Sequence, residues 1–457
     1  MTNEWENRNV LVLGLGDTGR SCIRWLAKRG AKVRAADTRE APPALGAVRE
    51  GFPRVDVRLG AFDEALLAGV DTVAASPGVA LREPVLRAAV ARGIEVVGDV
   101  EIFGREVGAA APGARVLGIT GTNGKSTVTA LAGAMGRASR RRTVVCGNIG
   151  TPVLDALDDY LERAGGQPAE SDLFVVELSS YQLETTSSLP LDAATVLNVT
   201  QDHLDRYASM DDYARAKARI FANAATRVVN RDDASSRAMG GARPLSFGVG
   251  EPQSEREWGF DPSFKRLRRG DEALIAVDEL GMKGLHNAVN ALAAHALVSE
   301  IGAPAAALAR AMRDFKGLPH RVELVAEHEG VRFYDDSKGT NVGAAVAALE
   351  GFREPVVLIA GGEGKGQDFA PLAAAVKANT RAVVLIGRDA PAIQKAIAGA
   401  GIPIERADSM EEAVRVAFAN AKPGDIVLLS PACASFDMFR NYAHRGDVFA
   451  ACAKALA

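Results

Sequence analysis

Residues 118–127 read GITGTNGKST, and this stretch decides the fold of the middle of the chain. The apolar run 116–119 has the composition of a buried strand, and residues 128–135 read as a helix. A glycine-rich turn between a strand and a helix directs backbone N–H groups and the positive end of the helix dipole at a polyphosphate. The stretch therefore predicts a phosphate-binding loop.

Within this loop, Lys125 can reach the terminal phosphates of a nucleotide and Ser126 can ligate Mg²⁺. The spacing departs from the standard P-loop pattern, which has glycine at position 119, where this chain has Ile119. A glycine-rich turn without a ligand is the alternative, and the Gly-Lys-Ser sequence argues against it. The remaining residues expected around the phosphates are Gly121, Thr122, Asn123, Gly124 and Thr127.

Composition describes an ordinary globular protein. The length of 457 residues suggests about three domains. The net charge of -3 gives no electrostatic footprint for DNA or RNA. The four cysteines lack CxxC spacing, so we expect reduced thiols in a cytoplasmic protein. From the polar N-terminus we expect no signal peptide, and no apolar run approaches the ~18 residues of a membrane span.

Residues 10–103 alternate short apolar runs with helical patterns, which is typical of a doubly wound parallel sheet. A strand at 10–13 precedes GLGDTG at 14–19, a match to GxGxxG, and a strand at 33–36 ends at Asp37. By itself this pattern predicts a dinucleotide site for NAD or FAD, although the same glycines also serve a tight turn. A third strand, 71–75, ends in Ser76-Pro77-Gly78.

A Pro/Gly-rich stretch at 104–114 predicts a linker. Beyond it we expect strands at 115–119, 143–146, 172–177, 194–199 and 226–229. Parallel strands place ligands at their carboxyl ends, so Asn148, Glu177 and His203 should converge beside the phosphate loop. A carboxylate ending an apolar strand there resembles a Mg²⁺-binding Walker-B residue. A helix cap for Glu177 and an ordinary loop position for His203 are the alternatives.

Residues 211–224 read as a helix with Tyr213, Lys217 and Phe221 on one apolar face. A lysine on such a face either extends its ammonium group to the rim or is held there for chemistry. Residues 244–283 predict an antiparallel elaboration, and 285–301 a helix with Asn287 and Asn290 in its first turn.

A second boundary is expected near Gly317-Leu318-Pro319. Strands at 331–334, 356–360, 383–386 and 426–429 then end in polar or glycine-rich loops, which predicts a third α/β unit. The loop GGEGKG at 361–366 lacks the Lys-Ser/Thr ending, so it predicts a carboxylate or phosphate contact or a plain turn.

These motifs resemble those of the Mur ligases, the ATP-dependent amino-acid-adding enzymes of peptidoglycan synthesis. The match covers nearly the whole chain in the family's order. It consists of GITGTNGKST, ELSS at 177–180, NVTQDH at 198–203, HNxxN at 286–290, LPHR at 318–321 and DDSKGTN at 335–341. Within the family, DTR at 37–39, GGEGKG and LSPACASFD at 429–437 look like the member that adds glutamate.

The resemblance implies an α/β chain of three domains. Residues 1–110 would form a Rossmann-like doubly wound domain that binds a UDP-sugar rather than NAD. Residues 111–317 would form a central P-loop ATPase-like domain, and residues 318–457 a Rossmann-like domain that binds glutamate. We expect a monomer that acts on small molecules, without a nucleic-acid or membrane partner.

The resemblance also implies the site residues. For the UDP-sugar they are Asp17, Thr18, Asp37, Thr38, Arg39, Ser76, Pro77, Gly78 and Asn148. For ATP they are the phosphate loop with Asn290, Arg321, Asp336 and Lys338. For glutamate they are Lys365, Ser435, Phe436, Thr340 and Tyr442. The catalytic residues would be Lys125, His203, Lys217 and Asn148.

The implied reaction phosphorylates the alanyl carboxylate of UDP-MurNAc-L-alanine with ATP, after which the amine of D-glutamate displaces phosphate. Two Mg²⁺ ions are expected, held by Ser126, Glu177, His203 and Lys217, with Lys217 carbamylated by CO₂. An NAD-dependent dehydrogenase and a ligase resembling folylpolyglutamate synthetase are the alternatives.

Overall fold

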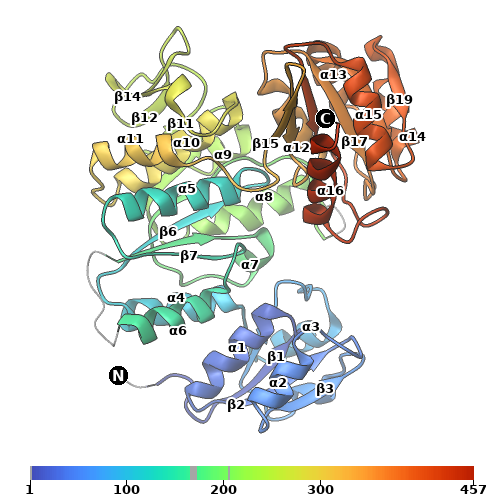
Figure 1. Cartoon of the computed structure of the whole chain (residues 1–457). Helices are drawn as coiled ribbons and strands as arrows, with labels where there is room; N and C mark the ends of the chain where they lie inside the picture. The colour runs from blue at the N-terminus through green and yellow to red at the C-terminus, as the bar shows by residue number, and fades with distance from the viewer. Residues whose placement is uncertain (1–2, 165–171, 204–205, 457) are drawn as a thin grey trace.

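The computed structural model describes residues 3–164, 172–203 and 206–456, which form three α/β units along the chain (Figure 1). The N-terminal unit has a parallel five-stranded sheet in the order β3-β2-β1-β4-β5. Its strands are β1 Asn9–Leu13, β2 Lys32–Asp37, β3 Asp56–Leu59, β4 Thr72–Ala75 and β5 Glu95–Val97. The helices are α1 Asp17–Lys28, α2 Leu45–Gly51, η1 Glu64–Leu67, α3 Pro84–Ala91 and α4 Asp99–Ala110.

Two features of this unit differ from the sequence prediction. The strands β3 and β5 were missed because both are short and β3 is largely exposed, so neither has the apolar run of a buried strand. The linker predicted at 104–114 was wrong for most of its length, since α4 continues to Ala110. Helix α4 packs on a helix of the central unit, and burial of Phe103 and Val107 outweighs the weak helix propensity of its glycines.

The central unit has a nine-stranded sheet in the order β14-β13-β12-β11-β10-β9-β6-β8-β7. Its strands are β6 Arg115–Thr120, β7 Thr143–Gly147, β8 Leu173–Glu177, β9 Leu191–Val196, β10 Ala224–Asn230, β11 Leu245–Phe247, β12 Glu257–Phe260, β13 Arg266–Arg269 and β14 Glu272–Ala276. Its helices are α5 Lys125–Ala138, α6 Val153–Ala164, α7 Ser180–Glu184, α8 Met210–Ala218, η2 Arg219–Phe221, α9 Ala234–Ala238, η3 Val277–Glu279, α10 Leu285–Ser299 and α11 Ala305–Asp314.

Three predictions for this unit need correction. The helix expected at 211–224 is shorter, because α8 ends at Ala218, a 3₁₀ turn follows to Phe221 and β10 begins at Ala224. The strand expected at 194–199 is Leu191–Val196, because Asn198 turns away to bind the phosphate loop. The region 244–283 is only partly antiparallel, since β11 pairs in parallel with both β10 and β12. Helix α10 covers β9 to β12 and packs on α5, so its inner face supports the phosphate loop's helix.

The C-terminal unit has a six-stranded sheet in the order β15-β16-β20-β17-β18-β19. Its strands are β15 Glu323–His328, β16 Val331–Asp335, β17 Val356–Gly361, β18 Thr380–Ile386, β19 Ile404–Arg406 and β20 Ile426–Leu429. Its helices are α12 Val342–Glu350, α13 Leu372–Asn379, α14 Ala390–Ile397, η4 Ala398–Ala400, α15 Met410–Asn420 and α16 Tyr442–Lys454. The antiparallel edge strand β15 was not predicted, because it is only partly buried.

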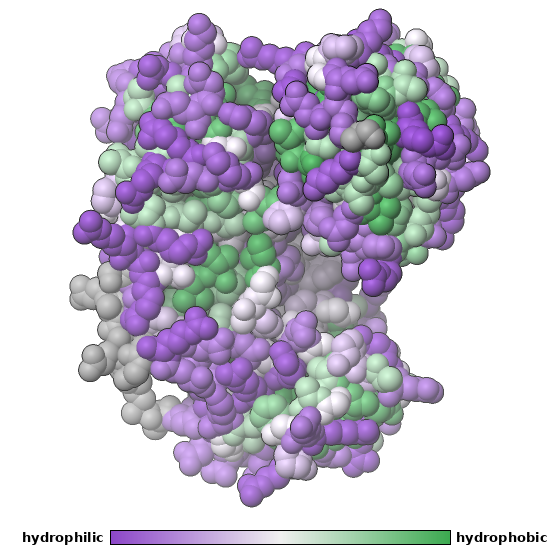
Figure 2. Space-filling model, in the orientation of Figure 1, coloured by the Kyte–Doolittle hydropathy of each residue, from purple (hydrophilic) through white to green (hydrophobic). Residues whose placement is uncertain are grey.

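The surface is hydrophilic over most of the face in Figure 2, which is hollowed on the right between the N-terminal and C-terminal units. Among the described residues, no helix combines the length and the apolar character needed to cross a membrane. Parallel sheets bind ligands at the carboxyl ends of their strands, so the polar loops at these ends form the candidate site.

Candidate functional site

The phosphate loop lies between β6 and α5, where the sequence predicts it. Gly124 precedes the helix with φ of 83°. The ammonium of Lys125 donates to the carbonyl oxygens of Gly121 at 2.9 Å and Thr122 at 2.8 Å. Burial lowers the pKa of Lys125, and the nearby Arg321 lowers it further. The loop thus holds a partly desolvated cation at the N-terminus of a helix.

Lys217 reaches the same carbonyl group from α8. Its side chain is 1% exposed, and its Nζ donates to the Gly121 oxygen at 2.7 Å. The Nζ also lies 4.4 Å from the centre of the Tyr213 ring. Burial sets the pKa of Lys217 well below its usual value, and repulsion from Lys125 adds to the effect. A buried amine with a low pKa is a nucleophile at neutral pH.

Glu177 ends β8 beside these lysines and is 1% exposed. Its Oε1 accepts a hydrogen bond from Nδ2 of Asn148 at 2.8 Å. Its buried Oε2 has no hydrogen-bond partner among the described residues. A buried, unpartnered carboxylate oxygen fits a divalent cation, because burying such a charge is costly unless a cation or donor compensates it. The helix-cap alternative for Glu177 finds no support in these contacts.

His203 lies in the loop after β9 with φ of 55°. Its Nδ1 makes a hydrogen bond of 2.8 Å with the hydroxyl of Tyr181. The other ring nitrogen lies 3.8 Å from a carboxylate oxygen of Asp202. A partner on Nδ1 fixes the orientation of the imidazole, as is usual for a metal ligand. Sequence reasoning did not single out Tyr181 or Asp202.

Side-chain hydrogen bonds hold the backbone of the phosphate loop in place, and one of them comes from Asn198, which the site list from the sequence lacked. The side-chain oxygen of Asn198 accepts hydrogen bonds from the backbone N–H groups of Thr122 at 3.2 Å and Asn123 at 2.8 Å. The hydroxyl of Thr122 lies 3.2 Å from that of Tyr213. Only the NVTQDH motif signalled Asn198, since nothing in its spacing indicates a contact with a loop 75 residues away.

The C-terminal unit completes this site from the other side. A guanidinium nitrogen of Arg321 donates to the hydroxyl of Ser126 at 2.8 Å. Asn341 and Asn123 exchange side-chain hydrogen bonds of 3.1 and 3.3 Å. The preceding His320 is fixed by its Nδ1, 2.7 Å from Asp335. Asn341 is a further residue that the site list from the sequence lacked.

A pocket of about 380 Å³ opens beside the phosphate loop, between the central and C-terminal units. Asn290 of α10 lines it together with Arg321, Asp336 and Lys338. Burial raises the pKa of Asp336 to about 7 and lowers that of Lys338 to about 8. The ammonium of Lys338 lies 3.8 Å from the centre of the Tyr442 ring. The pocket adjoins the N-terminus of α5, as a nucleotide site beside a phosphate loop requires.

The residues expected to bind the UDP-sugar line a second pocket of about 620 Å³, at the carboxyl ends of β1, β2 and β4 and of β7. They are Asp17, Thr18, Asp37, Thr38, Arg39, Ser76, Pro77, Gly78 and Asn148. Residues of two units therefore form one pocket. A Cβ at Gly19 would lie 1.8 Å from the carbonyl oxygen of Gly14, so here the glycine motif serves close packing of α1 on the loop.

The carboxylate of Asp37 accepts hydrogen bonds from neighbouring residues of the N-terminal unit. One carboxylate oxygen accepts from the backbone N–H of Leu15 at 2.7 Å, and both accept from the Arg39 guanidinium, at 2.9 and 2.7 Å. The hydrogen bonds from Arg39 lower the pKa of Asp37 to about 2. In a dinucleotide site this carboxylate would bind a ribose hydroxyl, and here Arg39 occupies its oxygens.

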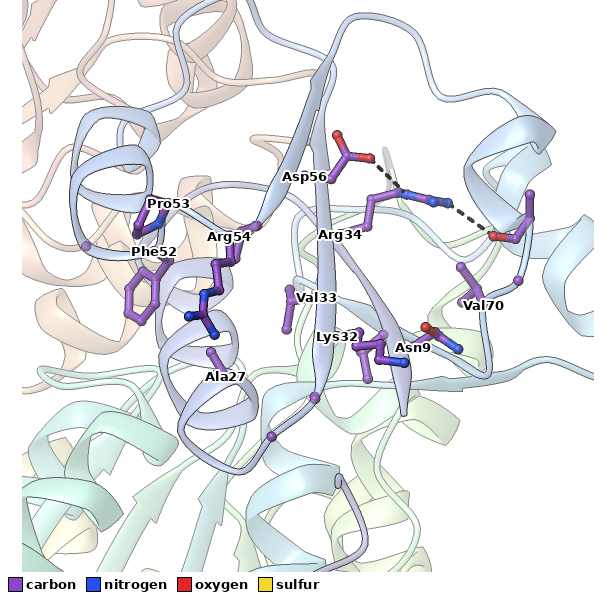
Figure 3. Close-up of a pocket in the computed structure, with 17 residues that line it drawn as sticks. Asn9, Ala27, Lys32, Val33, Arg34, Phe52, Pro53, Arg54, Asp56 and Val70 are labelled. Atoms are coloured by element: carbon purple, nitrogen blue, oxygen red, sulfur yellow. Dashed lines mark hydrogen bonds and ion pairs between the residues drawn. The ribbon is translucent and has the colours of Figure 1, made fainter. Parts of the chain in front are cut away.

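A hollow of about 810 Å³ lies at the opposite, amino edge of the same sheet (Figure 3). Its Arg34 donates to a carboxylate oxygen of Asp56 at 3.4 Å and to the carbonyl oxygen of Ala68 at 3.3 Å (Figure 3). It also donates to the carbonyl oxygen of Leu66 at 2.8 Å. Parallel sheets place ligands at their carboxyl ends, so this hollow is not the expected site.

The residues expected to bind glutamate lie on adjacent loops of the C-terminal unit. The loop with Lys365 pairs with the loop of Ser435 through the bridge Glu363–Ala434. The Lys365 ammonium lies 5.9 Å from the centre of the exposed Phe436 ring. Thr340 belongs to the loop before α12, and the backbone oxygen of Tyr442 accepts from the Ser337 hydroxyl at 2.7 Å.

Sequence reasoning missed the buried arginine that ties these loops together. Arg445 of α16 is 1% exposed and donates to the Ser337 hydroxyl at 2.9 Å and to the carbonyl oxygens of Ser337 and Cys433 at 2.8 and 3.1 Å. Burial lowers its pKa to about 10.

The fold and site define a P-loop nucleotide-binding protein of three α/β units. Three family models match it: Mur ligase MurD-like, N-terminal domain at residues 8–98; Mur ligase middle domain at 119–298; and Mur ligase, glutamate ligase domain at 320–433. The chain belongs to the Mur ligase family.

Two curated relatives are each 53% identical to this chain. The UDP-N-acetylmuramoylalanine–D-glutamate ligase of Methylobacillus flagellatus matches over 97% of this chain and 96% of its own. The enzyme of the same name from Thiobacillus denitrificans matches over 98% and 97%. Among solved structures, a UDP-N-acetylmuramate-alanine ligase from Thermotoga maritima aligns with a TM-score of 0.60 at 17% identity, covering 98% of this chain and 100% of that one. That likeness concerns the fold alone.

Proposed function

We propose that this protein is an ATP-dependent ligase that joins D-glutamate to UDP-N-acetylmuramoyl-L-alanine, producing ADP and phosphate for peptidoglycan precursor synthesis. Relatives named for this reaction at 53% identity over nearly the full chain support the choice of substrates. The observation that carries it is the convergence of Lys125, Lys217 and Glu177 beside Ser126. Glu177 accepts a hydrogen bond from Asn148, which lines the pocket proposed for the UDP-sugar, and Ser126 accepts one from Arg321, which lines the nucleotide pocket.

The proposed reaction begins with activation of the alanyl carboxylate, because a carboxylate is a poor electrophile. The N-terminus of α5 and Lys125 stabilise the charge of the transferred phosphoryl group. The amine of D-glutamate then attacks the acyl phosphate, and phosphate leaves. Asn148 holds Glu177, and Arg321 brings the C-terminal unit onto the phosphates.

Mg²⁺ would be held by Ser126 at the phosphates, and a second ion by Glu177, His203 and a carbamylated Lys217, where it would neutralise charge during phosphoryl transfer. The unpartnered Oε2 of Glu177 supports this assignment. A neutral Lys217 amine can add CO₂ with loss of a proton, and the resulting carbamate anion would be a ligand for the second ion. The low pKa of Lys217 supports this modification.

The remaining roles follow the same proposal. Asn290, Asp336 and Lys338 would contact ATP. Lys365 would bind a carboxylate of glutamate, since a dianionic amino acid needs a cation. Ser435, Phe436, Thr340 and Tyr442 would complete that site. We assign residues 1–110, 111–317 and 318–457 to the UDP-sugar, ATP and glutamate domains of a cytoplasmic monomer.

Phosphate release tests this function directly. Purified protein with ATP, Mg²⁺ and UDP-N-acetylmuramoyl-L-alanine should release phosphate when D-glutamate is added, and far less with L-glutamate. No phosphate release with either enantiomer would contradict a glutamate ligase. The dehydrogenase alternative predicts NADH binding, which the occupied oxygens of Asp37 argue against.

A further inference from the structure

Helices α1 and α6 lie side by side across the boundary between the N-terminal and central units (Figure 1). Helix α1 begins at Asp17 and helix α6 directly after Pro152, and both residues line the pocket of about 620 Å³. The two helices, one from each unit, therefore both start at this pocket. Their relative position sets the width of that pocket.

The facing sides of the two helices carry opposite charges. Helix α1 presents Arg20, Arg24 and Lys28 at intervals of four residues, which places them on one face. Helix α6 presents a complementary set of carboxylates: Asp155, Asp158, Asp159 and Glu162. This pattern produces attraction along more than two turns of each helix.

Arg24 is at the centre of the contacts. Its Nε lies 2.9 Å from Asp158, and its terminal nitrogens lie 3.7 Å from Asp155, 3.3 Å from Asp159 and 3.8 Å from Glu162. Lys28 continues the row, with its Nζ 2.5 Å from Asp158 and 3.0 Å from Glu162.

Ser21 and Arg20 extend the contacts toward the pocket. The Ser21 hydroxyl accepts a hydrogen bond of 3.0 Å from the backbone N–H of Asp155. A terminal nitrogen of Arg20 lies 4.0 Å from the same residue's carboxylate.

Burial makes these pairs stronger than ordinary surface ion pairs. The side chains of Asp155 and Asp158 are 9% and 10% exposed, and that of Arg24 is 31% exposed. Partly buried pairs are screened less by salt, and a network shares the entropic cost of ordering each side chain. The hydrogen bond to Asp158 raises the pKa of Lys28, as expected for a cation held by this network.

We propose that this ion-pair network, the α1–α6 clasp, is a positioning device that fixes the N-terminal unit on the central unit and thereby holds the two walls of the nucleotide-sugar pocket in register. Arg24 and Asp158 are its central positioning residues. The identity of the ligand rests on the proposed function, whereas the clasp itself rests on the contacts between the helices.

A charge-swap series tests the clasp. Arg24→Glu places a carboxylate among four others, Asp158→Arg places a guanidinium beside Arg24 and Lys28, and the double variant restores an attractive pair with the charges exchanged. Arg92→Glu is the matched control, because Arg92 pairs with Glu64 inside the N-terminal unit and the charge change is the same.

Three readouts are measured on the full chain. Distances between spin labels at the exposed positions Glu50 of α2 and Arg137 of α5 report the arrangement of the two units. Calorimetric titration with UDP and with UDP-N-acetylmuramoyl-L-alanine reports the affinity of the pocket, and phosphate release at saturating substrates reports kcat. Circular dichroism of each variant confirms that the units remain folded.

We expect wild type and Arg92→Glu to give the same narrow distance distribution, each single clasp variant to broaden it, and the double variant to narrow it again. Affinity for the nucleotide sugar should fall about fivefold in the single variants and recover in the double variant, with kcat at saturation unchanged. Added salt should weaken wild-type binding, because it screens the attraction between the two helices. It should weaken binding by each single variant less, because it also screens the repulsion that the substitution introduces.

Unchanged distances in Arg24→Glu would overturn the clasp. A broadened distribution without loss of affinity would overturn its role in positioning the pocket. If wild-type protein itself binds neither UDP nor the nucleotide sugar, the proposed function fails, while the distance measurements still decide whether the clasp holds the units.

Discussion

At the scale of single residues, the notable arrangement is that two lysines share one backbone oxygen. Lys125 and Lys217 both donate to the carbonyl group of Gly121, at 2.9 and 2.7 Å. Two ammonium groups that donate to the same oxygen repel each other, which favours loss of a proton from one of them. Lys217 is the better candidate, because its pKa is the more strongly lowered.

Lys217→Ala should therefore reduce turnover by about 100-fold or more, since it removes the proposed anionic metal ligand. A short carboxylate such as acetate should partly restore activity by occupying the vacated space. Phosphate release with and without acetate measures both effects, and the exposed Lys377→Ala serves as control. Complete failure of rescue would count against the carbamate.

Asp336 gives a pH-dependent prediction. Its pKa is raised to about 7 by burial, so between about pH 4 and pH 7 the folded state holds a proton that the unfolded state releases. Stability must then fall as pH rises through this window. Asp336→Asn removes the titration and should stabilise the protein by up to about 4 kcal/mol at pH 8, and far less at pH 5.

Calorimetric unfolding at both pH values checks this prediction, with the exposed Asp314→Asn as control. An equal shift in the midpoint at both pH values would show that Asp336 is already ionised at low pH.

At the scale of elements, the strand-loop-helix of the phosphate site depends on close approach of a second helix. Gly124 precedes α5 with φ of 83°, and a Cβ there would lie 2.6 Å from the side-chain oxygen of Asn290 on α10. The glycine is needed twice, for its backbone conformation and for the contact between α5 and α10.

Gly124→Ala should weaken ATP binding by about tenfold or more, for two reasons. The new methyl group displaces the Asn290 side chain from its position in the nucleotide pocket, and the positive φ strains the backbone by about 1 kcal/mol. Gly93→Ala is the matched control, since Gly93 has φ of 73° and open space around it. Fluorescence titration with a nucleotide analogue compares the two. Equal, small losses of ATP affinity in Gly124→Ala and Gly93→Ala would indicate that the contact with Asn290 has no effect on binding.

At the scale of the whole molecule, the active arrangement depends on where the C-terminal unit lies. Arg321 reaches Ser126 and Asn341 reaches Asn123, so both nucleotide-binding walls exist only when this unit is docked. The observed arrangement is a docked form, and we expect the C-terminal unit to move away from the central unit when products leave.

Asn341→Asp should shift the molecule toward an open form. Aspartate still caps α12 as Asn341 does, but it cannot donate to Asn123 and adds a charge beside Asp202, 3.4 Å away. Small-angle scattering should show a larger radius of gyration than wild type, reversed by ATP with the nucleotide sugar. Asn379→Asp on α13 should scatter like wild type, and identical profiles for all three would contradict the docking role.

The sequence by itself determined the phosphate loop, the parallel-sheet character of the three units and the family, because local apolar runs and glycine spacing encode strands, turns and motifs. It missed short or exposed strands such as β3 and β15, whose residues lack a buried pattern. Only the tertiary structure decided that Asn198, Asn341 and Arg445 brace the site and that charged faces of α1 and α6 meet. These contacts join residues far apart in the chain, and their free energy exists only once the units have packed.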